Sequence, residues 1–321
     1  MPDRRSGSAP GTVLRAGGGT YEVLLDDHTI IEASLRGRIK AQILGRGPSG
    51  RRVREAEART GDRVVAGDRV ITKAQNDGSC TIESVEPRNS ELARRAPGRS
   101  AHKAKVLFAN VDQVAIVFAA ARPEPNLRML DRFLVLAETN YLPALIVINK
   151  TDLVPDSDST ARFAAYAAAG YQIVMTSATD GSGLVELRAA LCHRETVLTG
   201  PSGVGKSSLL NAIEPGLELR VGEVSDAVNK GRHTTVTAAL VPLACGGFVG
   251  DTPGLREVGL WGFEDESLDA CFPEFRALLG QCRFANCTHT HEPDCAIREA
   301  VDAGDIDRAR YESYATLLSA D

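Results

Sequence analysis

Residues 200–207 read GPSGVGKS and fit the phosphate-binding pattern G-x-x-x-x-G-K-[ST]. Glycines in such a loop let successive backbone N–H groups point at phosphate oxygens. Lys206 would bridge the β- and γ-phosphates of a nucleotide as a catalytic cation, and Ser207 would ligate Mg²⁺. The expected phosphate-binding residues are Gly200, Pro201, Ser202, Gly203, Val204, Gly205, Lys206, Ser207 and Ser208.

A second motif, N-K-T-D at 149–152, closes a short apolar run at 145–148. Its chemistry suits guanine, because the Asp152 carboxylate can accept both the N1–H and the exocyclic amino group. Adenine offers neither donor there, and an unpaired buried carboxylate is unfavourable. Lys150 would lie along the base plane, and Asn149 would tie this loop to the phosphate-binding loop. The set of expected guanine-side residues is Asn149, Lys150, Thr151, Asp152, Ser177 and Ala178, with the Ala178 N–H meeting guanine O6.

The order of these motifs differs from that of an ordinary GTPase, which runs phosphate-binding loop, switch I, switch II, N-K-x-D and S-A. Here the base-reading pieces at 149–152 and 176–178 precede the phosphate-binding loop, and D-T-P-G at 251–254 follows it. Each piece keeps its own apolar strand, and a site is defined by geometry rather than by chain order. The sequence therefore predicts a circularly permuted P-loop GTPase domain.

The expected magnesium ligands are Ser207, a switch I threonine and Asp251, the last acting through water. The polar loop at 231–235 (GRHTT) supplies the threonine, either Thr234 or Thr235, and we slightly favour Thr235. The Gly254 N–H is expected to sense the γ-phosphate.

The residue after Gly254 is Leu255, where Ras-like GTPases place a glutamine that orients water. A leucine cannot align a water molecule, so His233 is the best remaining candidate for that role. The alternative is that His233 is an ordinary exposed loop histidine. The apolar residue also predicts slow intrinsic hydrolysis.

Cysteine and histidine crowd together near the C-terminus, at Cys282, Cys287, His289, His291 and Cys295. Three thiolates and one imidazole form an accepted tetrahedral set for structural Zn²⁺. The spacing favours His289 as the fourth ligand, with His291 as its rival. Reduced surface cysteines without metal are the alternative. In an intracellular chain, clustered cysteines and histidines indicate metal binding before disulfides. The other four cysteines, Cys80, Cys192, Cys245 and Cys271, are scattered.

The charge of the chain is unevenly distributed. Its net charge is −5, but residues 1–105 hold 20 Lys/Arg against 13 Asp/Glu, so the remainder is strongly acidic. A basic N-terminal third suggests that this part meets a polyanion, although a solvated charged face is the simpler alternative. The sequence contains no apolar run long enough to span a bilayer and no secretory signal, so a cytoplasmic location without a membrane partner is expected.

Coarse patterns divide the chain into four parts. Residues 1–10 are polar and expected to be disordered, and residues 11–100 carry five or so short strands that suit an OB-like β-barrel, with a linker at 88–100 and a basic loop at 46–59. Strand–helix alternation over 101–266 predicts a mixed sheet with helices on both faces, and 267–321 is expected to be a helical zinc-binding domain. The fold class is thus multidomain α/β.

Five segments together resemble the RsgA (YjeQ) family of GTPases that depend on the small ribosomal subunit. They are 149–152, GPSGVGKSS at 200–208, GRHTT at 231–235, DTPGLREVGLWG at 251–262 and CRFANCTHTHEPDC at 282–295. Val236, where a third threonine is frequent, departs from the family pattern and puts the switch I ligand in doubt. The resemblance implies an OB-fold, a permuted GTPase domain, and zinc held by Cys282, Cys287, His289 and Cys295.

The family also implies GTP hydrolysis to GDP and phosphate, stimulated by the small ribosomal subunit late in its maturation. Zn²⁺ as a structural ion, Mg²⁺ with GTP, rRNA as a partner and a monomeric chain are the matching expectations. The alternative is an RNA-binding assembly factor in which GTP fixes conformation and hydrolysis is incidental. A P-loop kinase is disfavoured, because such an enzyme does not need the motif at 149–152.

Overall fold

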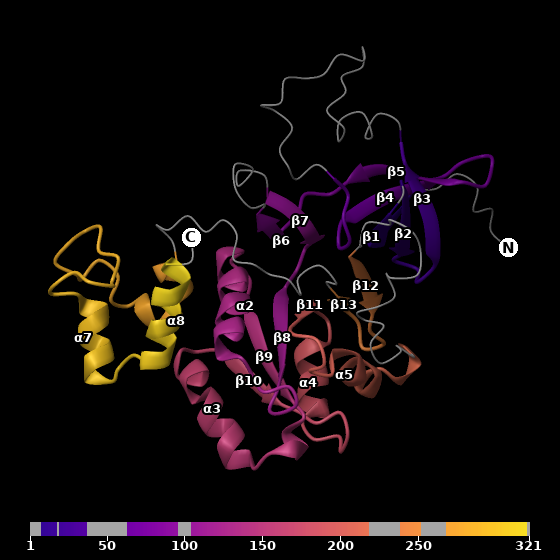
Figure 1. Ribbon diagram of the computed structural model, residues 1–321. Helices are drawn as coiled ribbons and strands as arrows, with labels where there is room; N and C mark the ends of the chain where they lie inside the picture. Colours follow the sequence, from indigo (N-terminus) through magenta and orange to yellow (C-terminus); the bar gives the residue numbers. More distant parts are fainter. Residues whose placement is uncertain are drawn as a thin grey trace. The chain divides into compact units, whose positions relative to one another are not determined.

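The computed structural model describes residues 8–17, 19–36, 63–95, 104–217, 238–251 and 268–319. These residues form two compact units, which are described separately below (Figure 1). The first unit contains residues 8–113, 191–198 and 238–251. The second contains residues 114–190, 199–217 and 268–319.

A closed five-stranded barrel begins the first unit. Its strands are β1 (Ser8–Gly17), β2 (Thr20–Leu25), β3 (Ile30–Leu35), β4 (Arg69–Ala74) and β5 (Cys80–Val85). The pairing runs β1–β2–β3–β5–β4 and returns from β4 to β1, with β3 and β5 parallel and the other pairs antiparallel. A closed ring of five short strands agrees with the expected OB-like barrel.

Aliphatic side chains fill the interior of the barrel, and an ion pair lies on its surface. The core residues are Val13, Val23, Ala33, Val64, Val70 and Ile82. Arg69 on β4 donates to both Asp26 carboxylate oxygens, at 2.9 and 3.1 Å. The Arg69 hydrogen bond outweighs burial and lowers the pKa of Asp26. The first strand begins at Ser8, inside the stretch 1–10 that was expected to be disordered, because residues 8–12 pair with β4.

The expected linker at 88–100 is wrong in part, because residues 91–95 form a strand. β6 (Glu91–Arg95) pairs antiparallel with β7 (Ala104–Ala109), and Leu92 and Phe108 in this hairpin are fully buried. Arg88 anchors the segment before it by donating to both carboxylate oxygens of the buried Asp68, at 2.7 and 2.9 Å. Sequence reasoning missed this strand because arginine and proline dominate its neighbourhood. The basic loop at 46–59 lies outside the described residues.

Three further strands belong to the first unit. β11 (Glu195–Thr199) pairs parallel with β13 (Phe248–Asp251), and β13 pairs antiparallel with β12 (Ala239–Pro242). Cys192, just before β11, forms a disulfide with Cys245 in the turn between β12 and β13. The sequence pattern singled out neither cysteine, because both belong to the four that are scattered along the chain.

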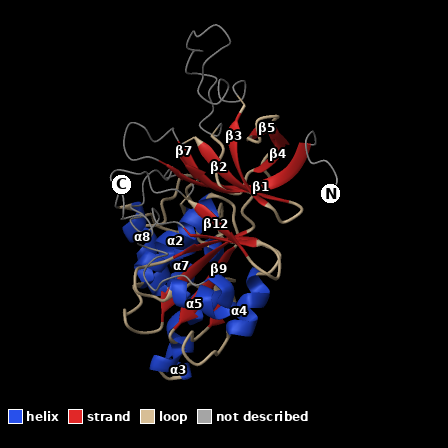
Figure 2. Cartoon of the chain, turned by 90° about the vertical axis from the view of Figure 1, so that its right-hand side faces the viewer, coloured by secondary structure: helices blue, strands red, loops and turns tan. Residues whose placement is uncertain are grey.

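The second unit carries the parallel strands β8 (Gln113–Ala119), β9 (Ala144–Asn149) and β10 (Gln172–Met175), whose pairs are β8–β9 and β9–β10. The helices α2 (Leu127–Thr139) and α3 (Asp156–Ala168) connect these strands, α4 (Leu184–Leu191) follows β10, and α5 (Lys206–Ile213) follows β11. Figure 2 shows these helices flanking the strands. These three strands are all parallel, and β11–β13 of the first unit combine one parallel with one antiparallel pair, so both strand directions expected from the sequence are present.

The C-terminal part of the second unit contains two short 3-10 turns (Asp269–Cys271 and Pro273–Phe275), α7 (Ala296–Ala303) and α8 (Arg308–Leu318). Phe272 and Phe275 are fully buried and stack at 5.2 Å, and the Tyr314 ring packs edge-on against both. These rings form an aromatic core for the helical domain that was expected from the sequence.

A buried arginine joins α8 to the rest of the second unit. Arg310 is 3% exposed and donates to Glu274 and Asp131, which is also buried, while its guanidinium lies over the rings of Tyr166 and Phe272. Burial dominates the raised pKa of Asp131, and the Arg310 charge opposes it. Removing one partner of such a pair would leave a buried charge uncompensated, which is strongly destabilising. None of the described helices combines the length and the apolar character that crossing a bilayer requires.

Candidate functional site

The phosphate-binding loop connects the end of β11 to the start of α5. Gly200 has φ +136°, and a Cβ there would lie 2.1 Å from the Val117 carbonyl oxygen on β8. Gly205 has φ +95°, and a Cβ there would lie 2.4 Å from the Asn149 side-chain nitrogen. Both positions demand glycine, because a side chain would collide with the neighbouring strand or loop. The loop is therefore packed tightly against the ends of β8 and β9.

Lys206 and Ser207, the first residues of α5, are both 6% exposed. The Lys206 ammonium donates to the carbonyl oxygens of Gly200 and Pro201, each at 2.7 Å. A lysine held inside its own loop is the geometry from which an ammonium group can meet incoming phosphates. Ser202 and Gly203 are exposed at the tip of the loop.

Asn149, at the end of β9, holds two loops together. It is 1% exposed, its side-chain N–H donates to the Val204 carbonyl at 2.9 Å, and its side-chain oxygen accepts the Ala178 N–H at 3.2 Å. The expected tie from this motif to the phosphate-binding loop is therefore present. The Ala178 N–H, expected to face guanine O6, donates to Asn149 in this structure.

Lys150 adds a second connection to the same loop. Its ammonium donates to the Gly203 carbonyl at 2.6 Å and to the Arg122 carbonyl. Arg122 follows β8 and was not singled out from the sequence, because no motif marks a residue that contributes only its backbone oxygen. Together these contacts bring the ends of β8 and β9 to the phosphate-binding loop.

Asp152 stands at the outer side of these loops with its side chain exposed. Its carboxylate accepts the Ser177 hydroxyl at 2.7 Å, and Ser177 itself is fully buried. Thr151 donates from its hydroxyl to the Thr176 carbonyl at 3.0 Å. These bonds orient the Asp152 carboxylate while leaving its second oxygen available to a ligand.

The second unit thus gathers three stretches that are far apart in sequence: 149–152, 176–178 and 200–208. Asp251 ends β13, where its backbone pairs with Leu198 of β11. The other sequence candidates, His233, Thr234, Thr235, Gly254 and Leu255, lie outside the described residues. What the described residues can do chemically is bind phosphate through a lysine and backbone N–H groups and bind a base through a carboxylate.

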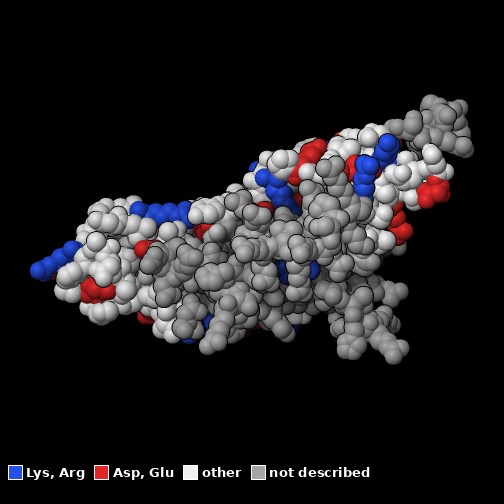
Figure 3. Space-filling view, turned by 90° about the horizontal axis from the view of Figure 1, so that it is seen from above, with Lys and Arg blue, Asp and Glu red and all other residues white. Residues whose placement is uncertain are grey.

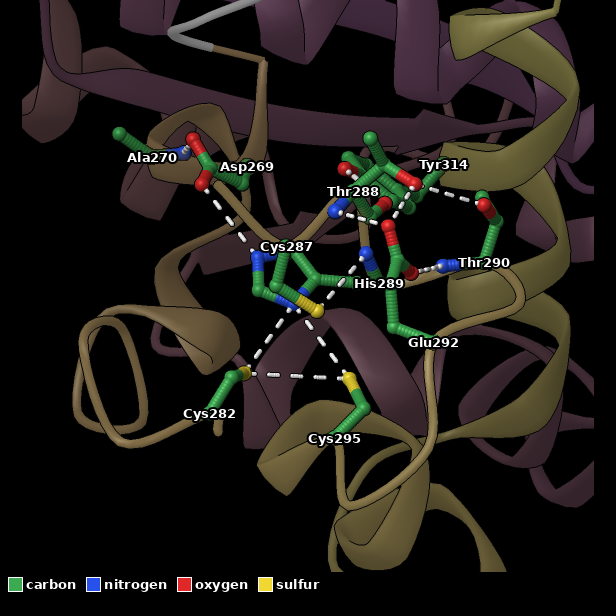
Figure 4. Close-up of polar contacts among 10 residues, drawn as sticks. All are labelled: Asp269, Ala270, Cys282, Cys287, Thr288, His289, Thr290, Glu292, Cys295 and Tyr314. Atoms are coloured by element: carbon green, nitrogen blue, oxygen red, sulfur yellow. Dashed lines mark hydrogen bonds and ion pairs between the residues drawn. The ribbon is translucent and has the colours of Figure 1, made fainter. Parts of the chain in front are cut away.

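The cysteine–histidine cluster lies between the 3-10 turn at Asp269 and the start of α7 (Figure 4). One donor atom from each of Cys282, Cys287, His289 and Cys295 lies within 4.8 Å of all the others. The Nδ1 atom of His289 is 3.5 Å from the sulfur atoms of both Cys282 and Cys295, which are 3.9 Å apart.

These separations fit a tetrahedral zinc ion. With Zn–S of about 2.3 Å and Zn–N of about 2.0 Å, the edges of such a tetrahedron are about 3.8 Å between sulfurs and about 3.5 Å between sulfur and nitrogen. His291 does not belong to the cluster, since its side chain is exposed and its ring nitrogen contacts the Thr290 hydroxyl at 3.0 Å. The geometry therefore favours His289 over His291 as the nitrogen donor.

Groups around the cluster orient His289. Its Nε2 faces the Asp269 carboxylate at 3.5 Å, and its carbonyl oxygen accepts the Tyr311 hydroxyl at 2.8 Å. Hydrogen bonding from His289 is the largest influence on the lowered pKa of Asp269. A carboxylate on the distal nitrogen of a ligating histidine fixes the ring and its tautomer. Sequence reasoning missed Asp269 because it lies 13 residues before Cys282, the first cysteine of the cluster.

Glu292 closes the loop that carries His289. Its carboxylate accepts the Thr288 N–H at 2.8 Å, the Thr288 hydroxyl at 2.7 Å and the N–H groups of Thr290 and His291 at 3.2 Å. Burial opposes ionisation, but these hydrogen bonds prevail and lower the pKa of Glu292. The ionised carboxylate thus stabilises the turn through these hydrogen bonds.

Comparison with known proteins identifies the family. The sequence profile of the RsgA GTPase family matches residues 85–261, more than half of the chain. A protein of Gemmatimonas aurantiaca named small ribosomal subunit biogenesis GTPase RsgA is 53% identical over 97% of this chain and 96% of its own length. The chain belongs to the RsgA GTPase family. A protein of the same name from Moorella thermoacetica is 42% identical over 96% of both chains.

Solved structures of RsgA-type proteins share the fold. The crystal structure of YjeQ from Thermotoga maritima matches with a TM-score of 0.76 and 35% identity, covering 97% of this chain and 98% of its own. YloQ, described as a circularly permuted GTPase, matches with a TM-score of 0.71 and 30% identity over 98% and 94% of the two chains. The predicted family, the permuted GTPase fold and GTPase activity are thereby confirmed.

Proposed function

We propose that the chain binds GTP with Mg²⁺ at the three loops gathered in the second unit. Asp152 would pair with the guanine edge, supported by Ser177, while the backbone of 200–208 and Lys206 would hold the phosphates. Ser207, Asp251 and Thr235 would ligate Mg²⁺ directly or through water, with Thr234 as the alternative to Thr235. The convergence of Asn149, Val204 and Ala178 carries this proposal.

We propose that hydrolysis is completed by His233, with Gly254 responding to the γ-phosphate. Lys206 would stabilise charge that develops on the transferred phosphate. With Leu255 in place of a water-orienting side chain, the isolated chain should turn over slowly. A partner that completes the catalytic site would raise the rate.

We propose that this partner is the small ribosomal subunit, and that the chain acts in the cytoplasm, as a monomer, late in maturation of that subunit. The relatives quoted above are named for biogenesis of the small ribosomal subunit, and they align over nearly the whole chain. The closed five-stranded barrel adds a fold that often binds oligonucleotides. We assign 11–100 to rRNA binding, 101–266 to GTP hydrolysis and 267–321 to zinc binding.

The distribution of charge indicates which residues would meet rRNA. Of residues 1–105, the described ones hold nine Lys/Arg and nine Asp/Glu, so they are neutral overall. The positive excess lies in three other segments. Residues 37–62 contain seven Lys/Arg and three Asp/Glu, residues 96–103 contain two Lys/Arg and no Asp/Glu, and residues 1–7 contain two Lys/Arg and one Asp/Glu. On the face drawn in Figure 3, basic and acidic side chains of the described residues are interspersed. We infer that the segment 37–62 supplies most of the phosphate contacts.

We also propose that Cys282, Cys287, His289 and Cys295 hold one structural Zn²⁺. Four protein donors leave no open coordination position, so the ion would stabilise the C-terminal domain and take no part in hydrolysis. Bound zinc would contribute folding free energy to a segment whose other support is the small aromatic core around Phe272 and Tyr314.

The decisive experiment measures GTP turnover with and without purified small subunits. We expect stimulation by orders of magnitude for the wild type and none for Lys206→Ala. Replacing Arg51, Arg52 and Arg54 by alanine should weaken subunit binding and reduce its dependence on salt, because fewer counterions are released. A matched variant, Arg276→Ala with Arg298→Ala, alters charges outside the N-terminal third and should retain that dependence. Equal turnover of the wild type with and without subunits would refute the proposed partner.

A further inference from the structure

The disulfide between Cys192 and Cys245 joins two connections of the first unit. Cys192 follows the last residue of α4, and Cys245 lies in the turn between β12 and β13, 53 residues later. The two Cα atoms are 5.5 Å apart, and both side chains are partly exposed. Small thiols and disulfides in solution therefore have access to the pair.

The backbone brings these two cysteines together independently of the bond between them. The His193 N–H donates to the Gly246 carbonyl at 2.8 Å, and the Phe248 N–H donates to the Arg194 carbonyl at 2.9 Å. Gly247 has φ +84°, and a Cβ there would lie 2.5 Å from the backbone N and O atoms of Arg194. Only glycine permits this close approach. With the bond reduced, the same contacts would keep the two thiols side by side.

The bond encloses segments to which the proposed function assigns contacts with the nucleotide. The 53-residue loop contains the phosphate-binding loop at 200–207 and the switch I candidates at 233–235. The hairpin β12–β13 begins shortly after those candidates and ends at Asp251, the first residue of the D-T-P-G motif at 251–254, which is the candidate for switch II. Switch segments of GTPases rearrange during the nucleotide cycle. A covalent link at the turn of this hairpin fixes its register against β11.

We propose that Cys192 and Cys245 are a reversible thiol–disulfide site whose oxidation latches the β12–β13 hairpin to β11 and slows GTP turnover. The effect on turnover rests on the proposed switch segments, whereas the chemistry of the site does not. In a reducing cytoplasm, disulfides are uncommon and those that form are typically transient or redox-sensing. The co-reactant is a low-molecular-weight disulfide of the glutathione class.

The exchange balances in two steps. One cysteine thiolate attacks a sulfur of the small disulfide, forming a mixed disulfide and releasing one small thiolate. The second cysteine thiolate then attacks the protein sulfur of the mixed disulfide, forming the Cys192–Cys245 bond and releasing the second small thiolate. Two electrons pass from the protein dithiol to the small disulfide, and the two thiol protons pass to solvent.

The test uses the full-length, zinc-loaded protein equilibrated with mixtures of reduced and oxidised glutathione. Alkylation of free thiols followed by peptide mass mapping should find the Cys192–Cys245 link at high oxidised fractions and its loss, without unfolding, at low ones. Turnover of GTP with small subunits should be at least threefold slower for the oxidised protein and should recover on reduction. A bond that resists reduction in the native protein, or equal turnover of the two forms, overturns the proposal.

The matched control carries Cys192→Ser and Cys245→Ser together. It retains Cys80, Cys271 and the three metal-cluster cysteines, so its turnover should be the same at every glutathione ratio and close to that of the reduced wild type. A response like that of the wild type would assign the effect to another cysteine and refute this site. Absence of GTP hydrolysis in the reduced wild type would contradict the proposed function instead, since the mapped link would be unaffected.

Discussion

The proposed nucleotide site draws on three stretches, 149–152, 176–178 and 200–208, whereas all four metal donors come from 14 consecutive residues. The nucleotide loops are joined by hydrogen bonds between strand ends, such as Asn149 to Val204. The candidate metal donors lie within 4.8 Å of one another and come from one short segment. Chain order can therefore be permuted around the first site, because each loop needs only its own strand. The second site needs its local spacing intact.

The largest effect is expected from removing one of the four candidate metal donors, which tests whether the C-terminal domain depends on a bound ion for its fold. Cys287→Ser should reduce zinc from one per chain to a small fraction and unfold 268–319, because apparent binding free energies of structural zinc are about 10–16 kcal/mol. Elemental analysis and circular dichroism measure both. GTP binding by the second unit should survive better than the C-terminal fold does. Cys80→Ser, in the barrel, is the control, and full zinc occupancy of Cys287→Ser would refute the assignment.

The next effect tests whether one carboxylate decides base specificity at the nucleotide loops. Asp152→Asn should weaken GTP binding and favour xanthosine triphosphate, because the C2 carbonyl of xanthine accepts from an amide. A site built to pair a polar edge rejects the wrong ligand by roughly 10⁴-fold. Competition binding with GTP, ATP and xanthosine triphosphate measures the change. Asp156→Asn, on the exposed start of α3, should leave specificity unaltered. Equal competition by ATP in the wild type would remove guanine from the site.

A smaller effect is expected from a residue outside the four candidate donors, which tests whether neighbouring groups strengthen metal binding. Asp269→Ala removes the carboxylate that faces His289 Nε2 and should weaken zinc binding by about 10–100-fold without changing the stoichiometry at saturating metal. Titration against a chromophoric chelator measures the affinity. Asp305→Ala, an exposed change in the same part of the chain, should match the wild type. An unchanged affinity for Asp269→Ala would show that the donors alone position the histidine.

The smallest effect concerns the strand that leads into the phosphate-binding loop. Burial, with repulsion from Asp112 as the next cause, raises the pKa of Glu195 at the start of β11 to about 8, and its Oε2 atom has no hydrogen-bond partner among the described residues. Arg69 opposes this shift and Asp68 reinforces it. A raised carboxyl pKa contributes stability that is complete below the unfolded value near 4.5 and is lost as pH rises to about 8.

Glu195→Gln should therefore equal the wild type near pH 4.5 and exceed it at pH 8, by on the order of 1 kcal/mol in the free energy of unfolding once solvent screening is considered. Urea unfolding at several pH values measures the difference. Glu186→Gln, on the exposed face of α4, provides the comparison. A difference that stays constant with pH would mean that folding does not shift the pKa of Glu195.

Local patterns carried most of what the sequence predicted. The candidate phosphate-binding loop, the candidate guanine motif and the three clustered cysteines are recognised by residue type and short spacing, so they can be identified without a structure. The permuted order was equally visible, since motif order is a property of the chain itself. The alternation of strands and helices expected over 101–266 is found among the described residues for the same reason, because apolar periodicity is local.

Only the tertiary structure decided which distant groups meet. Closure of the barrel through the parallel pair β3–β5, the Cys192–Cys245 bond and the Asp269–His289 contact join residues that no local pattern connects. The strand at 91–95 became visible only through its pairing with β7, because its arginine-rich sequence favours a loop. The spacing favoured His289 but left His291 open as its rival, and only the fold shows that His289 alone of the two points into the cluster. The sequence determines which chemical group each residue carries, but the free energy of each contact depends on which surfaces the fold brings together.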